Sequence, residues 1–384
     1  MSKNSESQAK KCASVGGQAL VEGVMMRSPS YTAIAVRRMD NKKISVKRDG
    51  NKSISDKYKF LKWPMIRGTV NFIESMKISL STMTKATDML GLEVEEENAS
   101  KFDKWVDKHL GKWALPVITA FSMILGVAIS VALFVFLPTL LGKVILGWEA
   151  YETNTEFWFG ALKSLIEGVA KVIIFILYIW LTSLIPDMKR VYMYHGAEHK
   201  SIFCYEKGLE LNVENVRAQR RFHPRCGTSF MFSMILLSIF IGIVFLFDVK
   251  TVWLRTLLKL ALLPITVGIG YEFIRYAGKH DNRLVRILAA PGLWMQRLTT
   301  REPDDSMIEV GITSLKCALP DEFPGFYEEC LEAMKAEEPS PEAPSDEAPE
   351  EPSGQPENAD PELAAERETH QEKEPETPED QGNL

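Results

Sequence analysis

Four long apolar stretches constrain the fold of this 384-residue chain more than any other feature of its sequence. They run from about 114 to 141, 157 to 185, 230 to 247 and 252 to 274. A helix needs about 20 apolar residues to cross the hydrocarbon core of a bilayer. The chain is therefore predicted to be an α-helical integral membrane protein with four transmembrane helices, in a membrane domain that covers 114–274.

Lysine and arginine are concentrated on one side of these stretches. The loop from 142 to 156 holds one lysine and three glutamates, whereas the loop from 186 to 229 and the segment after 274 are basic. Short cytoplasmic loops of membrane proteins are enriched in lysine and arginine. We therefore expect both termini and the 186–229 loop in the cytoplasm. The five cysteines are odd in number and irregularly spaced, so no disulfide framework is expected.

The rest of the chain divides into segments of different character. Residues 15–113 are predicted to form a small cytoplasmic α+β region, with a hairpin over 32–47, an amphipathic helix over 64–89 and a short helix over 101–110. Residues 275–336 are predicted to complete the domain, with a strand over 306–317 and a helix over 321–334. The polar N-terminus 1–14 and the acidic, proline-rich C-terminal tail 337–384 bury too little apolar surface to fold, so both are predicted to be disordered.

Ionisable residues fall inside two of the predicted spans. Lys163, Glu167 and Lys171 are four residues apart and share one helical face, and Lys259 lies in the fourth stretch, with Arg255 nearer its start. Ionisable side chains inside a membrane face the bundle interior or a water-filled cavity, and they mark functional paths. In the alternative interpretation, Glu167 pairs with its lysine neighbours and this end of the helix lies at the interface.

The 186–229 loop holds the densest group of metal-binding residue types. Three of the six histidines lie in it: His195 and His199, four residues apart around Glu198, and then His223, followed by Cys226. On a helix, His195 and His199 would point the same way. The two later residues could complete the ligand set, so His195, His199, His223 and Cys226 are predicted to bind a divalent metal. Zinc suits this mix of nitrogen and sulfur best, with iron and manganese left open. Glu198 is predicted to be the general base, or alternatively a ligand.

Other interpretations of this group stay open. Gly196 disfavours a helix interior, so the segment 195–200 could be a helix end or a loop. The histidines could also be interfacial side chains that pair with Glu198 and lipid phosphates. His280, oriented by Asp281, is a further candidate after the fourth stretch, or else an exposed surface residue.

Basic residues and glycines raise the question of a bound anion. The positive-inside pattern explains the arginines of the loop, although arginine also binds phosphate and could hold an anionic lipid head group. No nucleic-acid partner is expected, because no recognised binding module accompanies these residues. The loop arginines are Arg217, Arg220, Arg221 and Arg225.

The glycines between 15 and 27 could allow close approach to a ligand, or they could interrupt a strand and form a turn.

Several motifs, in order, link the chain to a known family. They are Gly16-Gly17-Gln18-Ala19 with Glu22-Gly23-Val24-Met25-Met26-Arg27, Arg67-Gly68 with Glu74-Ser75, His195-Gly196-Ala197-Glu198-His199-Lys200, His223-Pro224-Arg225-Cys226-Gly227-Thr228-Ser229 and Pro291-Gly292-Leu293-Trp294-Met295-Gln296. From about 15 to 319 the chain resembles the YqhQ-like bacterial membrane proteins. That resemblance implies an integral protein of a bacterial plasma membrane and a predicted metal-dependent enzyme. It also makes Glu22, Arg27, Arg67 and Glu74 candidate site residues.

Three functions are compatible with these features. The first is a metal-dependent hydrolase at the cytoplasmic membrane face, whose amphiphilic substrate is a lipid, a lipid-linked intermediate or a membrane peptide. The second is a non-catalytic membrane scaffold with a structural metal site. The third is a transporter or channel whose polar path uses the intramembrane charges. Four spans are few for one transporter chain, so the third function would require a homo-oligomer.

Overall fold

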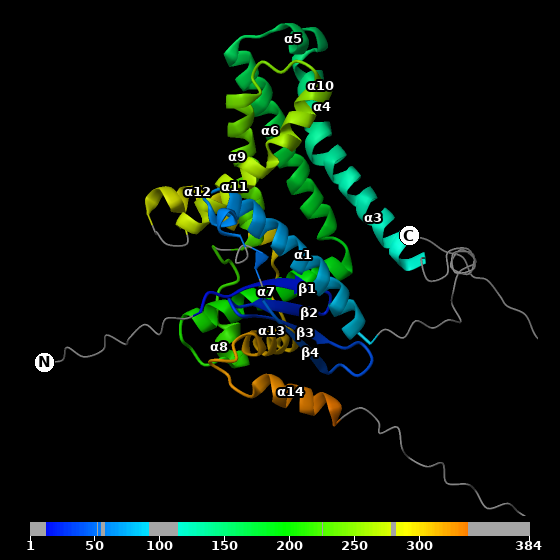
Figure 1. Cartoon of the computed structure of the whole chain (residues 1–384), viewed down its shortest axis with the longest axis vertical. Coiled ribbons are helices and arrows are strands. Elements are labelled where there is room, and N and C mark those ends of the chain that lie inside the picture. Colours follow the sequence, from blue (N-terminus) through cyan, green and yellow to red (C-terminus); the bar gives the residue numbers. More distant parts are fainter. Residues whose placement is uncertain are drawn as a thin grey trace, which may run out of the picture. The chain divides into compact units, whose positions relative to one another are not determined.

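The computed structural model describes residues 13–51, 53–54, 58–91, 114–224, 226–277 and 282–336. The predictions for 101–110, for the tail 337–384, and for His280 and Asp281 lie outside these residues. Within them the chain is mostly helical, with an N-terminal sheet and several long apolar helices (Figure 1). The predicted fold class is confirmed for this part of the chain.

The N-terminal region folds as a four-stranded antiparallel sheet. Its strands β1 (Gly16–Leu20), β2 (Gly23–Arg27), β3 (Tyr31–Arg37) and β4 (Ile44–Gly50) lie side by side in chain order. Ala35 of β3 is opposite Val24 on one side and Val46 on the other. The predicted hairpin is thus confirmed as β3 and β4, and the glycine-rich segment before it forms β1 and β2.

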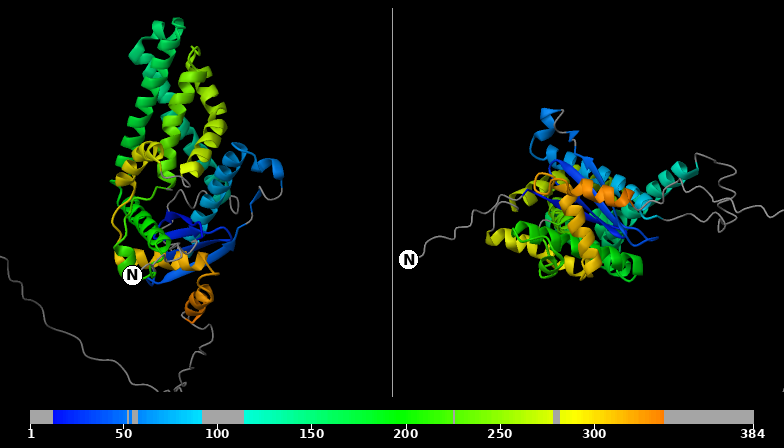
Figure 2. Two further views of the ribbon diagram at one scale, coloured as in Figure 1. Left: turned by 90° about the vertical axis from the view of Figure 1, so that its left-hand side faces the viewer. Right: turned by 90° about the horizontal axis from the view of Figure 1, so that it is seen from below.

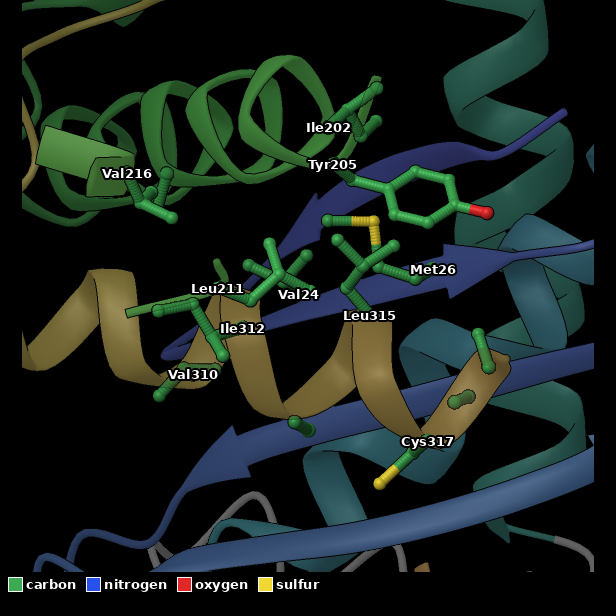
Figure 3. Close-up of a cluster of buried hydrophobic side chains, with 14 of the residues drawn as sticks. Val24, Met26, Ile202, Tyr205, Leu211, Val216, Val310, Ile312, Leu315 and Cys317 are labelled. Carbon is green, nitrogen blue, oxygen red and sulfur yellow. The ribbon is translucent and has the colours of Figure 1, made fainter. Parts of the chain in front are cut away.

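Helices cover both faces of this sheet, which is why its central strands are apolar throughout. On one face, Met25 and Ile34 pack against Ala86 and Leu90 at the end of α1 (Ile66–Met89), the amphipathic helix that the sequence predicts. On the other face, the strands pack against α7 (Pro186–Glu206) and α13 (Asp305–Ala318). Figure 3 shows side chains from β2, α7 and α13 meeting in this core.

The last helix is α14 (Phe326–Lys335), which confirms the helix predicted over 321–334. Figure 2 shows this helix, in orange, beside the sheet. The backbone N–H of Arg48 in β4 donates to the Tyr327 hydroxyl at 3.2 Å. The guanidinium of Arg48 also lies 4.2 Å from the centre of the Tyr327 ring. α14 therefore covers the edge strand of the sheet, which would otherwise present unpaired backbone groups.

The strand predicted over 306–317 is wrong, because this segment is the helix α13. Asp304 caps its N-terminus by accepting a hydrogen bond from the backbone N–H of Met307 at 2.9 Å. Met307, Gly311 and Leu315 are spaced four apart and are buried, so the helical period fits the core better than the weak alternation suggested.

Three helices are long and apolar enough to cross a membrane, and a bent pair brings the number to four among the described residues. The three are Ala120–Leu146, Phe157–Thr182 and Gly227–Phe245. The first begins within α3 (Ala114–Val131) and continues through a π-helical turn at Ala132–Phe136 to the end of α4 (Leu137–Leu146). The second and third are α6 and α9. After α4, the short helix α5 (Trp148–Thr153) leads to α6.

The fourth predicted span is broken. It consists of α10 (Val252–Ala261) and α11 (Leu263–Ala277), and the helix axis bends by 45° between them. Pro264 is the second residue of α11, and proline removes a backbone donor and clashes with the preceding turn. The proline therefore explains why a continuous apolar stretch is not a continuous helix.

A buried ion cluster joins these helices. The carboxylate of Glu167 in α6 accepts hydrogen bonds from the Arg255 guanidinium at 3.1 Å, the Lys259 ammonium at 2.5 Å and the Tyr151 hydroxyl at 2.8 Å. Lys259 also donates to the Thr139 hydroxyl of α4 at 2.7 Å. The Glu167 carboxylate thus connects α5, α6 and α10, and Lys259 extends the cluster to α4.

The two lysines that flank Glu167 in the sequence do not pair with it. Lys163 donates to the backbone carbonyl of Tyr151 at 2.6 Å, and Lys171 donates to the Ser238 hydroxyl of α9 at 3.2 Å. Arg255, which the sequence places near the start of the fourth stretch, is fully buried and contacts the Glu167 carboxylate.

The remaining helices connect the spans to the sheet. α8 (Val213–Arg217) follows α7, and α12 (Arg283–Thr299) packs along α9. Beyond α12 the chain returns to α7, where the backbone N–H of Arg301 donates to the Tyr192 carbonyl at 2.8 Å. A Cβ atom added at Gly196 would lie 2.1 Å from the Arg301 carbonyl oxygen. The glycine is therefore needed for close approach of two backbones and does not end the helix.

Replacing Glu167 by alanine is expected to destabilise the protein by about 3–5 kcal/mol, because it leaves the buried Arg255 and the half-buried Lys259 without their carboxylate. The measurement is the unfolding midpoint of detergent-purified protein, followed by circular dichroism. Glu149→Ala, at an exposed position in α5, is the control and should leave the midpoint unchanged. Equal midpoints for both variants would contradict the structural role of Glu167.

Replacing Gly196 by alanine is expected to destabilise the fold by about 1–3 kcal/mol through overpacking. Helix propensity alone predicts the opposite sign, a gain of about 1 kcal/mol. The matched control is Gly126→Ala in α3, where an added Cβ meets nothing within 4 Å. If close packing governs position 196, Gly196→Ala has a lower free energy of unfolding than Gly126→Ala. If Gly196→Ala is as stable as Gly126→Ala, close packing does not govern this position.

Candidate metal centre

His195 and His199 lie in the interior of one continuous helix, α7. The possibility that this segment is a helix end or a loop is therefore excluded. Because the two residues are one turn apart, their rings lie on the same face, with centroids 4.4 Å apart. Cys226 approaches them from a different segment, as the residue directly before α9.

Backbone carbonyls hold both imidazoles through the same nitrogen. Nδ1 of His195 lies 2.8 Å from the Thr299 carbonyl oxygen, and Nδ1 of His199 is hydrogen-bonded to the Arg221 carbonyl oxygen. A carbonyl only accepts, so each Nδ1 carries the proton and each Nε2 keeps its lone pair. Metal-binding histidines are held in this way by outer hydrogen bonds that fix the ring and its tautomer.

The two Nε2 atoms and the Cys226 sulfur converge. Sγ of Cys226 lies 3.2 Å from Nε2 of His195, and the donor atoms of all three residues lie within 4.8 Å of one another. Tetrahedral ligands bound to zinc at about 2.0–2.3 Å are separated by about 3.5 Å. The three donors therefore have separations that one ion could satisfy with small adjustments.

An unpaired atom provides a second test of whether a metal fits. Nε2 of His199 is buried and has no hydrogen-bond partner among the described residues. A buried polar atom without a partner costs about 1–3 kcal/mol, unless something supplies the missing interaction. Burial also lowers the pKa of His199, which favours the neutral imidazole that binds metals. The donor set and this orphaned lone pair both fit a divalent metal.

Glu198 lies beside the three donors. Its side chain is buried, and Oε2 is 4.0 Å from Nε2 of His195. The backbone N–H of Gly17 in β1 donates to this carboxylate, while burial raises its pKa. A Cβ added at Gly17 would lie 2.8 Å from Oε1 of Glu198, so only glycine lets the strand approach so closely. The first glycine motif of the sequence thus serves the site from the sheet side.

His223 is placed next to the three-donor group and is not one of its members. Its ring centroid is 5.7 Å from that of His199, and its Nε2 is 3.5 Å from the Glu206 carboxylate. Gln296 of α12 fixes the His223 backbone from both sides, at 2.7 Å to the N–H and 2.6 Å to the carbonyl. Direct coordination by His223 therefore stays a prediction.

Two of the further candidate residues brace elements around the site. Glu22, in the turn between β1 and β2, pairs with Arg190 at 2.6 Å and accepts from the Tyr194 hydroxyl at 3.2 Å. This contact raises the pKa of Arg190 and fastens the sheet to α7. Arg67 pairs with Glu272 at 2.6 Å and thereby joins α1 to α11.

The other candidates lie elsewhere. Glu74 accepts hydrogen bonds from the Ser53 hydroxyl at 3.0 Å and the Ile54 backbone at 2.5 Å. Arg27 ends β2, and the charges at 163, 167, 171 and 259 belong to the helical bundle. The sequence missed Thr299 and the carbonyl of Arg221 as groups that hold the histidines. No pattern could have identified them, because any residue type supplies a backbone carbonyl.

Comparison with known proteins agrees with the motifs. A family model described as a protein of unknown function, DUF1385, matches residues 63–321. The uncharacterized protein YqhQ of Bacillus subtilis (strain 168) is 33% identical over 305 residues, which cover 78% of this chain and 90% of that protein. No solved structure matches the chain. The chain therefore belongs to the DUF1385 family, whose function is unknown.

Proposed function

We propose that this protein is a metal-dependent hydrolase of a bacterial plasma membrane, with its site on the cytoplasmic side. The observation that carries the proposal is the convergence of two oriented imidazoles on the Cys226 sulfur. The nitrogen and sulfur donors favour zinc. His195, His199 and Cys226 would hold the ion, with Glu198 alongside.

The chemistry follows from the number of donors. A zinc ion with three protein ligands keeps one position open and lowers the pKa of a bound water to about 7. Glu198 is the group placed to accept a proton at Oε2 and to return it to a leaving group. The Gly17 N–H and the buried surroundings hold that carboxylate in one position.

The place of the site in the chain supports an amphiphilic substrate. Cys226 directly precedes α9, and α7 begins four residues after α6 ends. Both neighbouring helices are candidate spans. The loop charges favour the cytoplasmic side for this end of the spans. A lipid, a lipid-linked intermediate or a membrane peptide could present a cleavable bond there.

Burial favours a second candidate function, a membrane scaffold with a structural metal. His199 is 1% exposed, Glu198 5% and Cys226 8%. With Glu198 as a fourth ligand, the site would be closed and would stabilise the fold without turnover. The two functions differ in what Glu198 does, so this residue separates them.

Metal binding is tested by elemental analysis of the detergent-purified protein. Stoichiometric zinc is expected in the natural chain, and its loss is expected in the double variant His195→Ala, His199→Ala. Cys204→Ala serves as the control, because it removes a buried thiol from the same helix outside the donor group. Metal content that the double variant leaves unchanged would disprove the site.

The role of Glu198 is tested with the conservative variant Glu198→Gln. If Glu198 is the base, zinc stays bound while hydrolysis of 4-nitrophenyl butyrate or bis(4-nitrophenyl) phosphate falls at least about 100-fold. If Glu198 is a ligand, X-ray absorption shows a changed coordination shell and the unfolding midpoint drops. Turnover that is equal in both proteins would contradict the proposed mechanism.

A further inference from the structure

A groove lies beside the candidate metal centre. It has a volume of about 450 Å³, which is within the range of small-molecule sites. Most of its wall is apolar, and two cationic side chains interrupt that wall. Its lining residues are Phe203, Lys207, Arg220, Phe222, Pro224 and Leu293.

The two cations of the groove have no carboxylate partner among the described residues. Lys207 donates to the neutral side chain of Gln219 at 2.7 Å, and Arg220 is exposed without a described hydrogen bond or ion pair. Their neighbours behave differently: Arg217 pairs with Asp305 at 2.8 Å, and Arg221 lies 3.9 Å from Glu302. All three arginines fit the positive-inside pattern, but only Arg220 has no carboxylate partner among the described residues.

Apolar surface adjoins the groove on the side of the helical bundle. Leu293 belongs to α12, which packs along the candidate span α9. The same helix exposes Ile287, Leu288 and Trp294, the last at 50%. Exposed tryptophan and aliphatic side chains beside a span are typical of the membrane–water interface. Lipid molecules of the bilayer could therefore reach the groove from this side.

Aromatic rings connect the groove to the metal donors. The ring of Phe203, in the groove wall, is 4.7 Å from that of His223, which is 5.7 Å from that of His199. Phe222 and Pro224, which also line the groove, flank His223 in the chain. A molecule in the groove would thus lie one layer of rings away from the three donors.

From these features we infer that the groove binds the phosphate head group of an anionic phospholipid from the bilayer. Lys207 and Arg220 neutralise the phosphate, and the Phe203, Phe222 and Leu293 side chains contact the apolar part of the molecule. As a statement about the substrate class of the enzyme, this inference rests on the proposed function. As a statement about binding, it is tested without turnover.

The experiment measures lipid binding to the full-length, detergent-purified protein by native mass spectrometry. The probes are dihexanoyl phosphatidylglycerol, dihexanoyl phosphatidylcholine and inorganic phosphate. The anionic lipid is expected to bind more tightly than both other probes. Lys207→Gln with Arg220→Gln should weaken its binding about 25-fold, or about fivefold for each charge removed.

Two further variants control for net charge and for folding. Lys189→Gln with Arg283→Gln removes two exposed charges at the starts of α7 and α12 and should leave the affinity unchanged. Lys207→Arg with Arg220→Lys keeps both charges and should retain binding. If the Lys207 variant does not fold, Arg220→Gln alone carries the test, since its side chain makes no described contact.

Three outcomes would overturn the inference: equal affinity for the two lipids, an unchanged affinity in the Gln variants, or inorganic phosphate binding as tightly as the anionic lipid. Repeating the measurement after chelation separates this inference from the proposed function. Lipid binding that survives metal removal supports the groove even where no hydrolysis occurs. If hydrolysis persists but lipid binding is not selective, only the inference about the groove is refuted and the proposed function stands.

Discussion

The close contact between α7 and the backbone that follows α12 is the constraint on which the site depends. At Gly196 there is no room for a side chain, because the Arg301 carbonyl lies against the helix. The same approach brings the Thr299 carbonyl to His195. From the opposite direction, Gly17 brings a strand against Glu198. Two glycines thus allow backbone groups, which have no rotamers, to hold His195 and Glu198 of the candidate site.

Two clusters of buried polar groups are satisfied differently. In the helical bundle, Glu167 is surrounded by Arg255, Lys259 and Tyr151, so the charge network has internal partners. In the candidate metal centre, the outer nitrogens are paired, while the lone pair of His199 Nε2 has no partner among the described residues. The first arrangement is typical of a structural ion cluster. The second is typical of a site that receives a ligand.

Much of the fold follows from local patterns. The length of the apolar stretches predicted the spans, and the short β-branched runs predicted the β3–β4 hairpin. The segment 306–317 is a helix although its sequence predicts a strand, because four-residue spacing and alternation are hard to distinguish over so few residues. The fourth span is bent at a proline that the sequence displays, although its apolar character runs across the break.

The sequence by itself determined which residues could form the site, because three of its six histidines lie with Glu198 and Cys226 in one loop between two spans. It also placed Glu167 in a predicted span but left open whether its partners were the neighbouring lysines, and the structure assigns them as Arg255, Lys259 and Tyr151. Only the tertiary structure decided that His195, His199 and Cys226 converge while His223 lies beside them. The reason is physical: convergence depends on the carbonyls of Thr299 and Arg221 and on the room left at Gly17 and Gly196. Every residue type has a backbone carbonyl, and a glycine does not reveal which segment packs against it, so neither contact can be read from the sequence.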